Sequence, residues 1–69
     1  MKGGHTMRLS LKAARINAGY TQKNAAKHLK ISEDCLYNYE SGRSYPNVLT
    51  IKKMLSLYHV EFSDIIFPQ

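Results

Sequence analysis

The segment from residue 21 to residue 42, TQKNAAKHLKISEDCLYNYESG, constrains the fold more than any other part of the chain. Thr21 and Ser32 are residue types that cap the N-termini of helices, and each precedes apolar residues at helical spacing. The segment therefore predicts two short helices, over about residues 21–29 and 33–41, that are joined by a tight turn. Polar residues cover most of the second helix, so we expect it to be presented outward.

Three further helices are predicted on either side of this pair. The first runs from about residue 8 or 9 to residue 18, where Gly19 suits the left-handed conformation of a helix end. After Pro46, Asn47 can cap a fourth helix. The apolar residues of that helix recur at helical spacing: Val48, Ile51, Met54, Leu55 and Tyr58. A last short helix is expected over residues 62–67. Without strand-like alternation or internal repeats, the predicted fold class is all-α, as a five-helix bundle.

The chain length and the first residues bear on the domain organisation. A chain of 69 residues predicts one domain, which we expect to cover residues 8–67. Residues 1–7, MKGGHTM, contain a glycine pair and no periodic pattern. They are predicted to be a flexible N-terminal arm, or residues that precede a native start at Met7.

The chain carries 10 Lys and Arg residues against 5 Asp and Glu residues, a formal net charge of +5. This basic balance indicates a polyanionic partner such as nucleic acid, although a generally soluble basic surface has the same composition. Cys35 is the single cysteine, which excludes an intrachain disulfide, and no secretory signal or membrane-spanning apolar stretch is visible. We therefore expect a cytoplasmic protein without membrane attachment.

The sequence has no pattern that is typical of a catalytic or metal site. His5, His28 and His59 are scattered, and Cys35 has no partner at the spacing of a zinc site. A paired-carboxylate cleft, a nucleophile–base arrangement and a glycine-rich phosphate loop with a lysine are also missing. We expect a protein that is not an enzyme and that uses no metal, cofactor or small-molecule ligand.

A set of residues between about positions 8 and 66 forms a pattern of its own. Its members are Arg15, Gly19–Gln22, Ala25–Ala26, Leu29, Ile31–Ser32, Leu36, Tyr39–Glu40, Gly42, Pro46, Val60 and Asp64–Ile65. The pattern resembles the Cro/C1-type (Xre-like) helix-turn-helix family of phage repressors and bacterial regulators. The resemblance implies a lambda-repressor-like bundle and a transcriptional regulator, most often a repressor, that binds double-stranded DNA.

The resemblance also implies roles for particular residues. The second helix of the pair lies in the major groove in this family, so its outward residues are expected to read bases. They are Ser32, Glu33, Asp34, Tyr37 and Asn38. Gln22, Arg43, Ser44, Tyr45 and Asn47 match positions that meet the backbone of the duplex. Arg15 and Glu40 match a structural ion pair between the first and third helices.

The chemistry of these side chains supports the same roles independently. Asn38 can pair bidentately with adenine, and Tyr37 can pack on a thymine methyl group or bond a phosphate. The N-terminus of a helix is an anion site, which makes Thr21, Gln22 and Lys23 a predicted phosphate clamp. Arg43 adds a planar, charged fork.

Three residues depart from the family pattern. Lys30 occupies a turn position where the family usually has glycine. Glu33 and Asp34 are acidic at reading positions; they can accept from cytosine, stabilise the helix dipole, or do both. Because carboxylates repel phosphates, an alternative function is a protein-interaction module whose acidic third helix contacts a toxin or a second regulator.

The C-terminal residues suggest self-association. Phe62, Ile66 and Phe67 are more apolar than a chain of 69 residues can hide. We therefore expect a homodimer formed through residues 58–67, with each protomer covering one half-site.

Overall fold

Four α-helices form in the part of the chain that the computed structural model describes, residues 8–67. They are α1 (Leu11–Asn17), α2 (Gln22–Leu29), α3 (Glu33–Ser41) and α4 (Val48–Tyr58). Each begins after a residue whose side-chain oxygen accepts a hydrogen bond from the backbone N–H three positions on: Ser10, Thr21, Ser32 and Asn47. Each such cap stabilises its helix by about 0.5–2 kcal/mol, which explains why the helices start at these points.

Left-handed residues end most of the helices. Gly42 closes α3 with φ of 85°, and Gly19 follows α1 with φ of 88°. Lys30 and His59 close α2 and α4 with φ of 60° and 58°, although neither is a glycine. The turn between α2 and α3 therefore keeps the left-handed geometry that glycine favours while a lysine occupies it.

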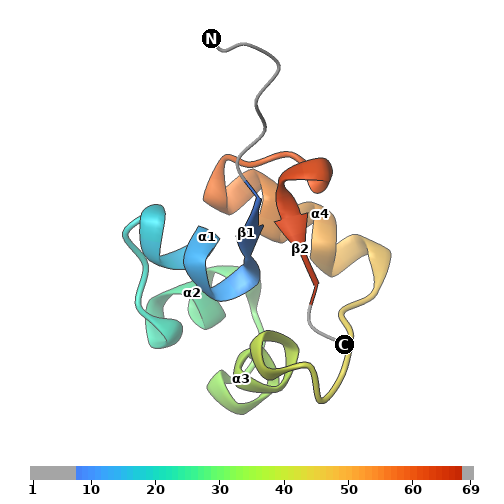
Figure 1. Cartoon of the computed structure of the whole chain (residues 1–69). Coiled ribbons are helices and arrows are strands. Elements are labelled where there is room, and N and C mark those ends of the chain that lie inside the picture. Colours follow the sequence, from blue (N-terminus) through green and yellow to red (C-terminus); the bar gives the residue numbers. More distant parts are fainter. Residues whose placement is uncertain (1–7, 68–69) are drawn as a thin grey trace, which may run out of the picture.

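The C-terminal segment corrects the predicted five-helix bundle. In place of a helix over residues 62–67, a 3-10 turn (Phe62–Asp64) leads into strand β2 (Ile65–Ile66). This strand pairs in parallel with β1 (Leu9–Ser10), and the two lie side by side in Figure 1. The described fold is therefore mostly helical with a two-stranded sheet, and not all-α.

The local sequence explains why each of the two strands forms in place of more helix. The Asp64 carboxylate accepts the Glu61 N–H at 3.0 Å, which closes a single turn. Two β-branched residues, Ile65 and Ile66, then favour extended backbone over further helix. At the other end of the chain the Ser10 cap makes α1 start at Leu11, later than predicted, and this leaves the preceding residues free to pair.

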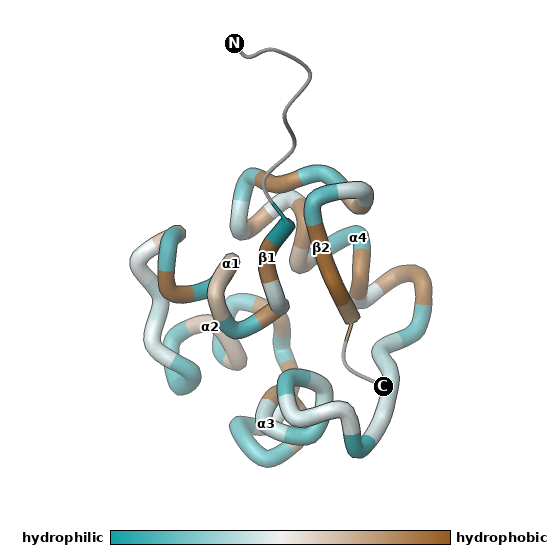
Figure 2. Tube along the Cα trace, in the orientation of Figure 1, coloured by the Kyte–Doolittle hydropathy of each residue, from teal (hydrophilic) through white to brown (hydrophobic). Residues whose placement is uncertain are grey.

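The core lies between the four helices and β2. Leu36 of α3 and Met54 of α4 are its largest fully buried side chains, and Ala25 and Ala26 of α2 allow close crossing of the helices around them. Figure 2 shows a strongly hydrophobic β2 and a trace of α3 that is hydrophilic along most of its length. The sequence predicts Val48 on the apolar face of α4, but this residue is exposed. Burial in α4 is confined to its second half.

The predicted arm, residues 1–7, lies outside the described residues. Between residues 8 and 67, no helix has both the length and the apolar character needed to cross a membrane.

Candidate nucleic-acid interface

Helix α3 is fixed to the protein by one side and exposes the other. Leu36 is fully buried against the core, and the side chain of Glu40 retains only 4% of its accessible surface. Tyr37, which lines a pocket together with Glu40, is 51% exposed, and Ser32 and the two acidic residues after it are exposed as well. The sequence predicted these outward residues as base readers, and the helix presents them together.

The two acidic residues of α3 stand at its N-terminus. Glu33 and Asp34 occupy the first turn, where the helix dipole stabilises each carboxylate by about 0.3–1 kcal/mol. Within residues 8–67 neither carboxylate forms an ion pair. The Ser32 hydroxyl oxygen accepts from the Cys35 N–H at 3.0 Å, which leaves its own hydrogen available for donation. This end of α3 therefore offers two carboxylate groups that accept hydrogen bonds and one hydroxyl that donates.

Asn38 links the middle of α3 to the loop that follows it. Its backbone carbonyl accepts from the N–H groups of Arg43 and Ser44 at 3.0 and 3.3 Å, and from the Ser41 hydroxyl at 3.3 Å. Its side-chain amide has no hydrogen-bond partner among the described residues. The loop is thus tied to α3 while the amide of Asn38 stays free for another ligand.

A buried ion pair joins α1 to α3. The Arg15 Nε donates to Glu40 Oε2 at 2.7 Å and Arg15 Nη2 donates to Glu40 Oε1 at 3.3 Å. The Gln22 amide donates to the same Oε1 at 3.1 Å, and Arg15 Nη1 donates to the carbonyl of Tyr20 at 2.9 Å. Because both carboxylate oxygens and three guanidinium nitrogens are satisfied, this network orients α3 against the last turn of α1 and the start of α2.

The remaining predicted phosphate contacts lie at two other helix starts. Thr21 and Lys23 are exposed at the N-terminus of α2, and Thr21 also caps that helix. Tyr45 and Asn47 are exposed before α4, where the ring of Tyr45 lies 6.3 Å from that of Phe67 and Asn47 caps the helix. All four residues are exposed, and the cap hydrogen bonds of Thr21 and Asn47 fix the helix starts at which they lie.

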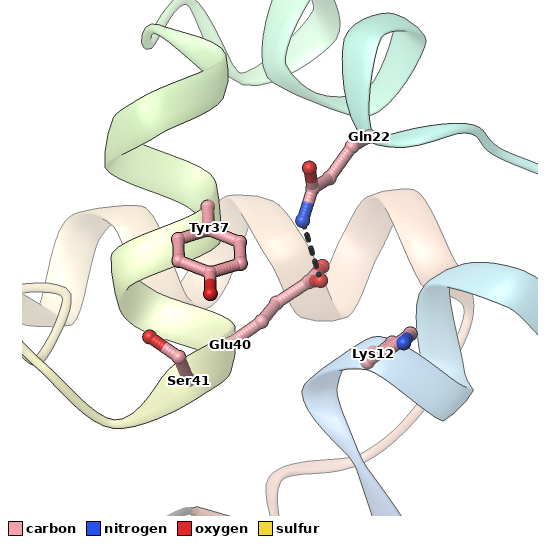
Figure 3. Close-up of a pocket in the computed structure, with 5 residues that line it drawn as sticks. All are labelled: Lys12, Gln22, Tyr37, Glu40 and Ser41. Atoms are coloured by element: carbon pink, nitrogen blue, oxygen red, sulfur yellow. Dashed lines mark hydrogen bonds between the residues drawn. The ribbon is translucent and has the colours of Figure 1, made fainter.

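Sequence reasoning missed a pocket at the centre of this arrangement. An open pocket of about 210 Å³ lies between α1, α2 and α3, lined by Lys12, Gln22, Tyr37, Glu40 and Ser41 (Figure 3). It brings together two predicted contact residues, Gln22 and Tyr37, with two that were not predicted, Lys12 and Ser41. The position of Lys12 near this site could have been predicted from the sequence. Lys12 precedes Arg15 by three positions, so the two residues share a face of α1.

A buried tyrosine stands behind the ion pair. Tyr58 of α4 is 4% exposed, and its hydroxyl is a buried polar atom without a hydrogen-bond partner in the described structure. Burial, and next the negative charge of Glu40, raise the pKa of Tyr58 to about 12, while Arg15 acts in the opposite direction.

The pKa of a second tyrosine, Tyr39 of α3, is also raised. The largest cause is its side-chain hydrogen bond with Cys35, and burial is the next.

Comparisons with known proteins agree with this geometry. A family model described as helix-turn-helix matches residues 11–65. The HTH-type transcriptional regulator ImmR of Bacillus subtilis (strain 168) is 48% identical over 50 residues, which are 72% of this chain and 39% of that relative. The chain therefore spans well under half the length of the curated relative it matches. No solved structure matches the chain significantly.

Proposed function

The chain belongs to the Cro/C1-type helix-turn-helix family, and from that premise we propose that it is a sequence-specific transcriptional regulator that binds double-stranded DNA and represses transcription. The observation that carries the proposal is the two-sided character of α3. Its inner side is fixed by Leu36 and Glu40, and its outer side exposes Tyr37 together with the polar residues at its start. The major groove, about 12 Å wide, admits a helix with such a face.

In this proposal α3 reads base edges in the major groove. Asn38 accepts from and donates to adenine with its free amide, and Ser32, Glu33 and Asp34 accept from or donate to the neighbouring bases. Tyr37 contacts the duplex beside them. The support is the exposure of Ser32, Glu33, Asp34 and Tyr37. The amide of Asn38, which is half-buried, has no partner within the described structure.

The contacts to phosphates surround this helix in the same proposal. Thr21, Gln22 and Lys23 at the start of α2 form one clamp, and the loop of Arg43, Ser44, Tyr45 and Asn47 forms another. The support is that the N–H groups of Arg43 and Ser44 are bonded to the carbonyl of Asn38, which holds the start of this loop against the reading helix. Phosphate contacts of this kind position a protein on the duplex.

A homodimer completes the proposal. Phe62 and Ile66 are 58% and 51% exposed, and the ring of Phe62 lies 5.5 Å from that of Phe67. These residues offer an apolar surface for a second copy, which would bind a half-site one helical turn away. Sedimentation at micromolar concentration tests this point; monomer alone, with and without DNA, would refute the dimer.

The experiment that tests the proposed function is an in vitro selection from random duplexes, followed by affinity measurements against salt. We expect an enriched palindrome and a steep fall of affinity with salt, since each phosphate contact contributes about 0.9 to the logarithmic slope. No enrichment, with weak binding that disappears at moderate salt, would reject sequence-specific regulation.

The exposed acids of α3 support a second candidate, a protein-interaction module. Glu33 and Asp34 have no cationic partner in residues 8–67. Replacing both with glutamine raises non-specific DNA affinity if α3 faces phosphates, because two repulsive charges are removed. The same replacement leaves DNA affinity unchanged and weakens partner binding if α3 faces a protein.

A further inference from the structure

A second pocket lies between the end of α2 and the middle and end of α4, two helices that pack against each other. It has a volume of about 350 Å³ and is lined by His28, Leu29, Lys30, Lys53, Ser56 and Leu57. We propose that this pocket binds an acidic segment of a partner protein, in which one apolar side chain is flanked by carboxylates. The inference goes beyond the proposed function and does not depend on it.

The pocket lies at the opposite end of its helices from the proposed DNA contacts. The phosphate clamp is at the start of α2, whereas His28 and Lys30 lie at the end of this eight-residue helix, about 12 Å away. In α4 the proposed contact residue Asn47 caps the start, whereas Ser56 and Leu57 lie in the last turn. None of the lining residues belongs to the proposed DNA interface, so an occupant of this pocket need not compete with the duplex.

The rim of the pocket carries positive charge that the protein does not compensate. Lys30 and Lys53 are exposed, and neither forms an ion pair or a side-chain hydrogen bond within residues 8–67. No acidic residue of the described chain lines the pocket. The C-termini of α2 and α4 contribute roughly half a negative charge each, which is less than the full charges of the two lysines. The local field therefore stays positive and favours a carboxylate.

The bottom of the pocket is apolar. Leu29 is buried and Leu57 is half-buried, whereas the polar residues that line the pocket with them are exposed. Among these, the ring of His28 lies edge-on to the ring of Tyr20 at 5.3 Å, and Ser56 offers a hydroxyl. Leucines below and hydrogen-bonding groups above match a segment that places an apolar side chain between acidic ones.

The backbone at Lys30 gives a separate reason to assign a ligand to this pocket. Lys30 has φ of 60° and ψ of 42°, in the left-handed region that glycine adopts without strain and that other residues adopt at a cost. Strain of this kind is typical of positions that contact a ligand, where function offsets the cost. A glycine here would suit the turn better, but only the lysine brings a charge to the rim of the pocket.

The open shape of the pocket favours a protein segment over a small molecule. Sites for small ligands enclose most of the surface of the ligand. This pocket is open to solvent, so a small anion would stay largely hydrated in it. A protein segment can extend its contacts beyond the pocket to neighbouring exposed residues such as Lys27 of α2.

Selection from a random peptide library tests the proposal. The library is presented to the immobilised chain with an excess of scrambled duplex, which occupies any DNA-binding surface. We expect enriched peptides in which acidic residues flank one leucine, isoleucine or phenylalanine. Such a peptide, added to the free chain, should shift the backbone amide NMR signals of Leu29, Lys30 and Ser56 and leave that of Asp34 unchanged.

The outcomes of the selection separate this inference from the proposed function. No enrichment of acidic peptides, or amide shifts confined to α3, would overturn the inference. A chain that binds no duplex but selects these peptides at the pocket would reject the proposed function and support the inference.

Matched lysine variants test whether the peptide recognises the pocket or only the net charge. Lys53→Met should weaken the selected peptide about two- to fivefold, the effect of one solvent-exposed ion pair. Lys52→Met lowers the net charge equally at an exposed neighbour that does not line the pocket, and it should leave the affinity unchanged. Equal weakening by the two substitutions would overturn the inference.

Lys30→Gly separates binding from folding. It removes the second charge of the rim and relieves the backbone strain, so the variant should unfold at the wild-type temperature or above it. It should nevertheless bind the selected peptide about two- to fivefold more weakly. Unchanged affinity in Lys30→Gly would show that the strained lysine has no part in binding and would contradict the proposal.

Inorganic phosphate tests a free anion as the other occupant. At constant ionic strength, we expect millimolar phosphate to leave the amide signals of Lys30 and Ser56 unchanged, because it cannot use the apolar bottom of the pocket. Saturable shifts with phosphate alone, together with displacement of the selected peptide, would assign the pocket to a small anion and overturn the inference.

Discussion

The ion pair of Arg15 and Glu40 is the residue-scale feature on which the reading helix depends. Its side chains retain 8% and 4% of their accessible surface, so each charge is compensated by the other and by Gln22. A buried pair of this kind adds little net stability over an apolar pair, but losing one partner is expensive. Its contribution here is orientation, since it joins α1, α2 and α3 at one point.

Substitution of Glu40 by Gln should therefore destabilise the protein by about 3 kcal/mol, because Arg15 is left as an uncompensated buried charge. The same substitution at Glu33, exposed on the same helix, should lower the free energy of unfolding by no more than about 1 kcal/mol, the size of its interaction with the helix dipole. Urea denaturation of both variants measures the difference. Equal effects of the two substitutions would mean that the ion pair does not hold α3.

Tyr58→Phe should stabilise the protein by about 1 kcal/mol at neutral pH. The hydroxyl of Tyr58 is buried without a hydrogen-bond partner in the described structure, and a buried unsatisfied hydroxyl costs about 1–3 kcal/mol. The ring, which lies 6.3 Å from that of Tyr20, keeps its packing in the variant. Thermal unfolding checks this, and a lower midpoint than wild type would contradict it.

The same residue makes stability depend on alkaline pH. Its pKa rises from the ordinary 10.0 to about 12 on folding, so between these values the unfolded chain loses a proton that the folded chain keeps. The unfolded state is then favoured, and the free energy of unfolding falls by up to about 1.4 kcal/mol per pH unit. Below pH 10 this contribution to stability is fully present. Subtracting the profile of Tyr58→Phe isolates the effect, and parallel profiles from pH 9 to 12 would refute it.

At the scale of the elements, helix starts and helix ends follow different chemistry. All four starts use a Ser, Thr or Asn cap, whereas two of the ends place a lysine and a histidine in the left-handed region. A side chain in that region costs roughly 1–2 kcal/mol. The turn between α2 and α3 therefore carries strain that a glycine at position 30 would relieve.

Lys30→Gly should relieve this strain and raise the free energy of unfolding by about 0.5–1 kcal/mol, after the larger entropy of glycine in the unfolded chain is counted. Ser44→Gly, in the exposed loop after α3 and without positive φ, serves as the control and should not stabilise. Chemical denaturation compares the two variants. A destabilised Lys30→Gly would mean that the lysine side chain supports the turn through contacts.

The elements also show where sequence reasoning succeeded. The structure starts α2 and α3 at Gln22 and Glu33, because the caps Thr21 and Ser32 act locally and their chemistry is legible in the sequence. The pairing of Leu9–Ser10 with Ile65–Ile66 joins segments more than fifty residues apart. Strands of two residues have no periodicity to detect, so the β-branched pair was predicted as part of a helix.

At the scale of the whole molecule, the site is assembled from segments that the sequence keeps apart. The outward residues of α3 could be predicted, because Leu36 and Glu40 identify its inner side and leave the rest exposed. The pocket could not, since Lys12 and Ser41 meet only when α1 packs beside α3. The exposure of Val48 had the same cause: helical spacing identifies a face but not how far along the helix other elements cover it.

The central claim is that α3 reads base edges through Asn38, and a double-mutant cycle between protein and DNA tests it most directly. Wild type and Asn38→Ala are titrated against the enriched duplex and against copies in which one adenine at a time is replaced by 7-deazaadenine, which removes N7 from the major groove and preserves base pairing. At one adenine per half-site we predict a loss of about 1–3 kcal/mol for the wild type and none for Asn38→Ala. Equal losses for both proteins at every adenine would contradict the account.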